Sequence, residues 1–117
     1  TQVINISKWK KNLSEFAGDR NWEQFHNPKN LVMALSVESS ELLEHFQWLT
    51  EEQSKNLESE KLEEIKEEMA DVLLYMFRLS DVLGVELNDA LKEKFKKNAL
   101  KYPVEKSKGT AKKYNKL

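Results

Sequence analysis

No cysteine occurs among the 117 residues of the chain, and glycine and proline are scarce, with three and two copies. The absence of cysteine excludes disulfides, thiol nucleophiles and thiolate zinc sites, and it is typical of the reducing cytoplasm, where we expect this protein to work. Two histidines are too few for a multi-histidine metal site. No apolar run approaches the roughly 20 residues that a membrane span needs, so we expect no contact with a membrane. Because the chain starts at Thr1 and not at methionine, we expect the natural N-terminus to be missing.

Charged residues make up 33% of the chain and hydrophobic residues 39%, a balance that favours helices over turn-rich β structure. The net charge of −1 conceals an uneven distribution: residues 1–91 carry 18 acidic and 9 basic side chains, and residues 92–117 carry 2 acidic and 10 basic ones. A carboxylate-rich body can hold metal ions and a lysine-rich end can attract a polyanion, although both can also be ordinary solvated surface. We expect no nucleic acid polymer as a partner, because the basic segment lacks the interleaved aromatic residues that stack bases.

Apolar residues recur at helical spacing over four segments of the chain. These segments span about residues 6–17, 28–48, 61–83 and 88–102. Gly18 and Gly84 are placed to end the first and third helices, and Asn27 with Pro28 is a typical start for the second. Pro103 prevents the fourth helix from continuing. The sequence therefore predicts an all-α fold, an antiparallel bundle of four main helices.

The whole chain, residues 1–117, is short enough to form a single domain. Residues 51–60 read as a polar connector between the two central helices, and about residues 104–117 read as a basic C-terminal tail without a clear period. On the third helix the predicted core stripe repeats every three or four residues. It consists of Leu62, Ile65, Met69, Val72, Met76, Leu79 and Leu83.

Two acidic residues interrupt the apolar faces of the central helices. Glu38 occupies the position that would complete the stripe of leucines on the second helix, and Asp71 is the one polar residue between Met69 and Phe77. Burying an ionised carboxylate without a partner costs several kcal/mol, so such a group must be neutralised, paired or bound to a metal ion.

Each of these two carboxylates belongs to a pair one helical turn apart, Glu38 with Glu41 and Glu68 with Asp71. Like charges at this spacing repel each other, so the arrangement favours a cation between them, shared by two antiparallel helices. Oxygen-only ligands suit Mg²⁺ or Mn²⁺, whereas di-iron bundles use Glu-x-x-His pairs, and no histidine stands three residues after any of the glutamates Glu38, Glu41, Glu44 and Glu68. Mg²⁺ usually bridges carboxylates to phosphate oxygens, which indicates a phosphorylated small molecule as the ligand. The alternative is that all four acids line exposed helix faces.

Further motifs accompany the acidic pairs: WEQFH at 22–26, FQW at 46–48 and KYP at 101–103. With these motifs in this order, the chain resembles the MazG-like all-α nucleoside triphosphate pyrophosphohydrolases, and within them the dCTP pyrophosphatase branch. The resemblance covers nearly the whole chain. It implies that a nucleoside triphosphate, dCTP or a modified dCTP in the first place, is hydrolysed to the monophosphate and pyrophosphate. Whether the biological purpose is nucleotide pool sanitation or removal of modified nucleotides stays open.

The resemblance also implies the roles of the acidic residues. Mg²⁺, with Mn²⁺ as a possible substitute, would be bound by Glu38, Glu41, Glu68 and Asp71. Glu41 is the candidate to orient or deprotonate the attacking water, and Glu38 is the second candidate catalytic residue. Spacing alone does not rank the four carboxylates.

Six residues are expected to bind the substrate: Trp22, His26, Trp48, Lys94, Asn98 and Tyr102. By resemblance, the first three hold the base near the ends of the second helix. The last three follow one another at steps of four residues along the fourth helix, and their side chains suit phosphate, sugar and base contacts in turn. The alternatives are that Trp22 packs the loop onto the bundle, that His26 only fixes the loop by hydrogen bonding and that Lys94 faces solvent. We expect Phe25 to pack in the core.

A chain of this size with an apolar third helix is expected to assemble as a homodimer or homotetramer. Two other functions stay open at this point. One is a non-catalytic helical protein-interaction module whose acidic pairs are surface. The other is a phosphatase that uses the same metal chemistry and releases orthophosphate.

Overall fold

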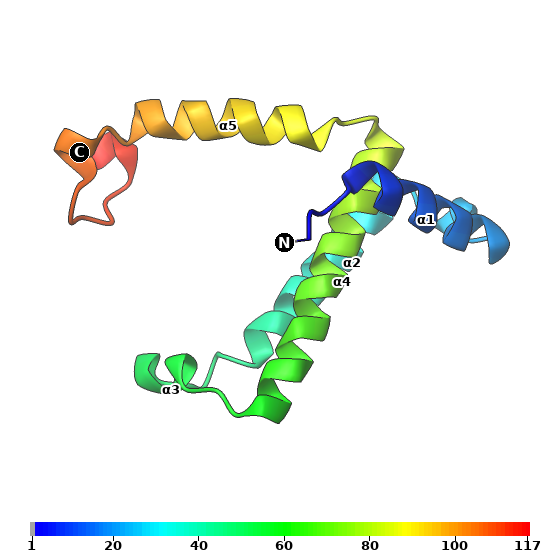
Figure 1. Cartoon of the computed structure of the whole chain (residues 1–117), viewed down its shortest axis with the longest axis horizontal. Helices are drawn as coiled ribbons and strands as arrows, with labels where there is room; N and C mark the ends of the chain where they lie inside the picture. The colour runs from blue at the N-terminus through cyan, green and yellow to red at the C-terminus, as the bar shows by residue number, and fades with distance from the viewer. Residues whose placement is uncertain (1) are drawn as a thin grey trace. The chain divides into compact units, whose positions relative to one another are not determined.

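The computed structural model describes residues 2–117, which form two compact units, one that ends at Gly84 and one that spans Val85–Leu117. Every regular element within these described residues is a helix, which confirms the predicted all-α class (Figure 1). None of the helices in residues 2–117 combines the length and the apolar composition that crossing a membrane requires.

The first unit contains three long helices, and the second contains one. In the first unit the long helices are α1 (Ile6–Asp19), α2 (Pro28–Glu44) and α4 (Ser59–Leu83), with η1 (Glu23–Phe25) and α3 (Glu51–Lys55) in the connections. Helices α2 and α4 lie side by side and run in opposite directions, and α1 packs against α4 (Figure 1). The second unit consists of α5 (Leu87–Lys101), α6 (Val104–Ser107) and η2 (Tyr114–Lys116).

Helix α2 begins and α4 ends where the sequence predicts. The Asn27 Oδ1 atom accepts a hydrogen bond of 2.9 Å from the backbone N–H of Asn30, and Pro28 occupies the first turn. Gly84 follows α4 with a φ of 69°, a left-handed conformation that a residue with a Cβ atom adopts only at a cost. These two signals fix the limits of the helical pair that carries the acidic residues.

Two predicted helix ends are wrong, and the predicted polar connector contains a helix. Gly18 lies inside α1 and not at its end, because the residue that reverses the chain is Asn21, with a φ of 56°. Helix α2 stops at Glu44, and residues 45–48 form turns. The connector contains α3, which Thr50 and Gln53 start with a reciprocal capping box. Local side-chain hydrogen bonds of this kind start short helices that the spacing of apolar residues does not predict.

The core lies where α4 meets α1 and α2. Its most buried apolar residues come from all three helices: Ala17, Leu31, Ile65 and Phe77. The predicted stripe on α4 is wrong at several positions, since Met69 is 54% exposed and Leu62, Met76 and Leu83 are exposed as well. The four exposed members stand seven residues apart, so one edge of the stripe lies outside the packed face along the whole of α4, while Ile65, Val72 and Leu79 are less exposed. Phe25, expected in the core, is also exposed.

Candidate functional site

Three carboxylates from the two central helices converge on one space. Oxygens of Glu38 and Glu41 on α2 and of Glu68 on α4 all lie within 4.8 Å of one another. The pair on α2 shares a helical face because its members are three residues apart, and the antiparallel packing of α4 brings Glu68 opposite them. The predicted convergence of acids from two helices is therefore present.

The environment of these oxygens suits a cation. Oε2 of Glu38 and Oε2 of Glu68 are both buried, and neither finds a hydrogen-bond donor among residues 2–117. Burial first, then the neighbouring Glu41 carboxyl and the charges of Asp71 and Glu68, raise the pKa of Glu38 to about 7. Burial and Glu41 also raise the pKa of Glu68. Unpartnered, mutually repelling oxygens of this kind fit a hard divalent cation such as Mg²⁺ or Mn²⁺.

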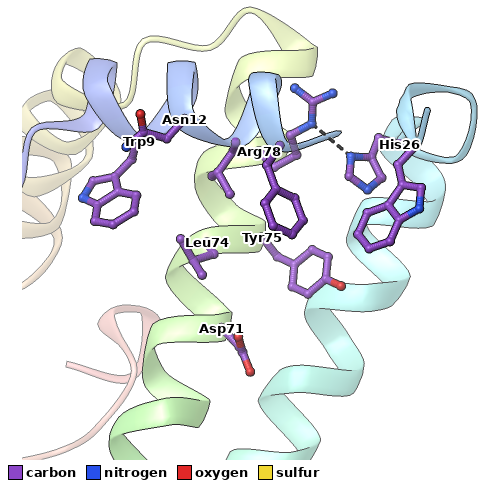
Figure 2. A pocket seen from close by; sticks show the side chains of 10 residues that line it. Trp9, Asn12, His26, Asp71, Leu74, Tyr75 and Arg78 are labelled. Carbon is purple, nitrogen blue, oxygen red and sulfur yellow. Dashed lines mark hydrogen bonds between the residues drawn. The ribbon is translucent and has the colours of Figure 1, made fainter. Parts of the chain in front are cut away.

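Asp71, the fourth predicted ligand, stands outside this group of three but beside it. Its charge contributes to the raised pKa values of Glu38, Glu68 and Tyr75. Asp71 and Tyr75 lie one turn apart on α4, and both side chains point toward the side where α2 runs (Figure 2). Both also line a cavity in the first unit. Asp71 therefore links the carboxylate cluster to that cavity.

The cavity has a volume of about 380 Å³ and is walled mainly by aromatic and apolar side chains of α1, α4 and the segment that precedes α2 (Figure 2). A volume of this order suits a small ligand such as a nucleoside. The lining residues are Trp9, Asn12, Leu13, Phe16, Trp22, His26, Asp71, Leu74, Tyr75 and Arg78. Polar atoms at the wall come from an amide, an imidazole, a phenol, a carboxylate and a guanidinium, so the cavity can both stack a ring and form hydrogen bonds with it.

Two of the six predicted substrate contacts, Trp22 and His26, lie in this wall. The Trp22 ring meets Phe16 edge to face with a centroid distance of 5.7 Å, and its centroid is 6.2 Å from that of His26. Trp48, beyond the end of α2, is 85% exposed in the described chain. The remaining three, Lys94, Asn98 and Tyr102, belong to the second unit, and their assignment to the substrate stays a prediction.

Several wall residues were not predicted as contacts from the sequence. Arg78 had a detectable signal, because it directly follows the apolar stretch that ends at Phe77 and is charged, as Asp71 is. Tyr75 follows Asp71 by one turn and could have been found in the same way. Trp9 and Asn12 carry no such signal, since they reach the cavity only because α1 packs against α4.

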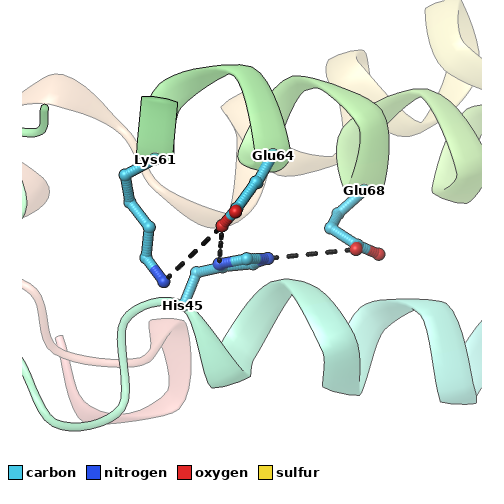
Figure 3. Close-up of polar contacts among 4 residues, drawn as sticks. All are labelled: His45, Lys61, Glu64 and Glu68. Atoms are coloured by element: carbon cyan, nitrogen blue, oxygen red, sulfur yellow. Dashed lines mark ion pairs between the residues drawn. The ribbon is translucent and has the colours of Figure 1, made fainter. Parts of the chain in front are cut away.

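His45, which follows the last residue of α2, lies beside the carboxylate cluster (Figure 3). Its Nε2 atom is 3.9 Å from Oε1 of Glu68, and its Nδ1 atom is 3.8 Å from Oε2 of Glu64. Lys61 approaches the same Glu64 oxygen at 4.0 Å. The imidazole thus lies between two carboxylates of α4 and limits the positions that the Glu68 side chain can take.

The raised pKa of Glu38 predicts how stability depends on pH in the metal-free protein. Between pH 4.5 and about 7 the folded chain holds a proton on Glu38 that the unfolded chain has lost, so this group lowers the free energy of unfolding as pH rises through that window. In thermal unfolding followed by circular dichroism with EDTA, we expect the wild type to lose stability relative to Glu38→Gln from pH 5 to pH 7.5. Added Mg²⁺ should stabilise only the wild type at pH 7.5. Parallel pH profiles for the two proteins would contradict the origin assigned to the shift.

The chain is similar to known proteins over most of its length. The sequence profile described as the MazG-like family matches residues 33–117. The chain is 42% identical over 106 residues to dCTP pyrophosphatase 1 of Mus musculus and 37% identical over 106 residues to that of Homo sapiens. Each alignment covers 89% of this chain but only 62% of the relative, so the chain spans less than two thirds of these proteins. A crystal structure of a pyrophosphatase from Archaeoglobus fulgidus superposes with a TM-score of 0.80 at 36% identity and covers 88% of this chain and 96% of that one.

Proposed function

Because the chain belongs to the MazG-like family, we propose that it is a metal-dependent nucleoside triphosphate pyrophosphohydrolase that acts on dCTP or a modified dCTP. The observation that carries the proposal is the position of Asp71, which acts electrostatically on the carboxylate cluster and also lines the aromatic cavity. The carboxylate cluster and the aromatic cavity therefore lie next to each other in one unit, as a metal site for the phosphates and a pocket for the base would have to. The dCTP substrate is taken from the names of the mouse and human relatives.

In this proposal Glu38, Glu41, Glu68 and Asp71 hold Mg²⁺, for which Mn²⁺ can substitute. The bound ion supplies neutralisation of the charge that develops on the phosphate oxygens. Water attacks the α-phosphorus, the bond to the α–β bridging oxygen breaks, and the pyrophosphate leaves with the electron pair. We assign Glu41 to orient that water and accept its proton, with an oxygen of Glu38 within 4.8 Å of it.

The base occupies the aromatic cavity in this proposal. Trp22 offers a ring face, and its edge-to-face contact with Phe16 limits how the indole can rotate. Tyr75, one turn from Asp71, lines the same cavity. An aromatic side chain can stack on any base, so the polar atoms of the cavity wall must distinguish one base from another.

We expect Trp22→Ala to raise KM for dCTP by roughly tenfold or more, because stacking of one base on an aromatic side chain is worth about 1–3 kcal/mol. The kcat should change much less, since the carboxylates stay in place. Steady-state kinetics measure both constants, and Trp22→Phe, which keeps an aromatic face, is the matched control. A fall in kcat with an unchanged KM would place Trp22 outside the base site.

We further propose that the protein assembles with copies of itself and works in the cytoplasm. The support for assembly is a set of large apolar side chains left exposed on α2 and α4. They are Val32, Met33, Val37, Leu43, Met69, Leu73 and Met76. Large apolar side chains left exposed in this number are typical of a protein that buries them in an interface. Light scattering coupled to gel filtration tests the assembly, and a mass of about 13.7 kDa, that of one chain, would contradict it.

Product analysis tests the proposed function directly. Purified protein is incubated with Mg²⁺ and each common dNTP and NTP in turn, and the products are separated by ion-exchange chromatography. Release of pyrophosphate and dCMP from dCTP is the expected result. Release of orthophosphate and dCDP would instead identify the phosphatase alternative, and an absence of turnover with every nucleotide would favour the interaction module.

A further inference from the structure

Arg78 is a buried cation in the wall of the cavity that the proposed reaction does not use. The residue is only 8% exposed, and its side chain comes from α4. Its Nε–H donates a hydrogen bond of 3.1 Å to Nδ1 of His26, on the segment that precedes α2 (Figure 2). Its Nη1 atom lies 3.5 Å from Oδ2 of Asp81, one turn further along α4. The guanidinium is thus held between a carboxylate and an imidazole.

This contact decides which nitrogen of His26 carries the proton. A guanidinium has only donors and stays charged at any physiological pH, so the Nδ1 atom that it meets must offer a lone pair. A neutral imidazole has one N–H, which is then on Nε2. Burial, followed by the charge of Arg78, lowers the pKa of His26, in agreement with a neutral ring.

The protonated side of the ring faces away from Arg78. In Figure 2 the Nδ1 side of His26 is turned toward Arg78, and the other ring nitrogen points away from it. His26 belongs to the cavity wall, and its ring lies 6.2 Å from the Trp22 ring at an angle of 60°. A base stacked on Trp22 would therefore have its edge near the Nε2–H group.

We infer that Arg78 is a positioning residue that fixes His26 in its Nε2–H tautomer, so that the cavity presents a hydrogen-bond donor to an acceptor atom of the bound base. The inference rests on the proposed function, because it takes the occupant of the cavity to be a nucleotide base. Ring nitrogens and carbonyl oxygens, such as N3 and O2 of cytosine, are acceptors of this class. A base that turns an amino group toward His26 is disfavoured, since two donors would face each other.

The tautomer is measured first, in the free protein without metal or nucleotide. Long-range ¹H–¹⁵N correlation spectra of the imidazole rings distinguish a protonated ring nitrogen from an unprotonated one. The chain has two histidines, and His45→Gln assigns the signals. At pH 8 we expect an unprotonated Nδ1 and a protonated Nε2 for His26 in the wild type, and a mixture of the two tautomers in Arg78→Met. A protonated Nδ1 in the wild type, or an identical pattern in the variant, would overturn the inference.

The ligand side is measured with dCMP as the probe, without turnover. We expect Arg78→Met to weaken dCMP binding about two- to fivefold, because only the fraction of His26 rings that carry the proton on Nε2 then offers the donor. In dCTP hydrolysis KM should rise by the same factor while kcat changes less than about twofold. Arg78→Lys, which keeps a cationic donor, should recover most of the affinity, and the circular dichroism of both variants shows whether they fold. A loss of kcat at constant KM, or equal dCMP affinity in wild type and Arg78→Met, would contradict the inference.

The two proposals fail in different ways. If the wild type hydrolyses no nucleotide, the proposed function is wrong, while the tautomer spectra still decide what Arg78 does to His26. If dCTP is hydrolysed but the spectra place the proton on Nδ1, the function stands and the role of Arg78 is refuted.

Discussion

Replacing Glu38 by glutamine is expected to lower kcat for dCTP hydrolysis by roughly a thousandfold without loss of helical structure. The substitution removes a charged ligand oxygen from the cation site, and a metal ion contributes several kcal/mol to stabilising charge in the transition state. The fold should tolerate the change, because Glu38 is half-buried among like charges that already raise its pKa to about 7. Steady-state kinetics and far-ultraviolet circular dichroism measure the two effects.

Asp71→Asn should behave in the same way, since Asp71 links the cluster to the cavity. The matched control is Glu67→Gln, the same chemical change at an exposed position of α4 next to Glu68. That variant should keep the wild-type rate. Rates within about threefold of wild type for both Glu38→Gln and Asp71→Asn would refute the roles assigned to these carboxylates.

Leu31→Ala is expected to reduce the free energy of unfolding by about 2–5 kcal/mol, the range found for truncating a fully buried leucine. Leu31 is 1% exposed and lies in the first turn of α2, so its side chain anchors the end of the helix that leads to Glu38 and Glu41. The alanine leaves a cavity that the surrounding side chains fill only in part. Urea denaturation followed by circular dichroism gives the change.

Leu100→Ala provides the comparison for this prediction. It makes the same substitution in a helix, α5, at a residue that is 83% exposed. We expect it to change the free energy of unfolding by less than about 0.5 kcal/mol. If Leu31→Ala cost no more than Leu100→Ala, Leu31 would not be the core residue that its burial indicates.

The central helices and the acidic pairs could be predicted from the sequence because each depends on local signals. An Asn-Pro start, a glycine stop and apolar spacing define α2 and α4, and the i, i+3 steps place two carboxylates on one face of each helix. Glu38 interrupts an apolar stripe, which indicated that this side chain has a role other than packing in the core. That such acids converge follows from the antiparallel packing of α2 and α4, which follow each other in the chain as long helices.

The cavity could not be predicted in the same way. Its wall combines α1 with α4 and with the segment before α2, and the angle at which α1 crosses α4 sets which side chains meet. Trp9 and Asn12 reach the cavity only through that packing. The contact between Arg78 and His26 joins residues 52 positions apart, and neither residue carries a local signal for the other. Contacts of this range depend on tertiary structure that periodicity does not encode.

The most direct test is a crystal structure of the protein with Mn²⁺ and dCMP, in which anomalous scattering locates the ion. We expect an anomalous peak among the carboxylate oxygens of Glu38, Glu41 and Glu68, with Asp71 turned toward it and the base of dCMP beside Trp22. An ion bound elsewhere, with these carboxylates directed apart into solvent, would contradict the metal site and with it the proposed reaction.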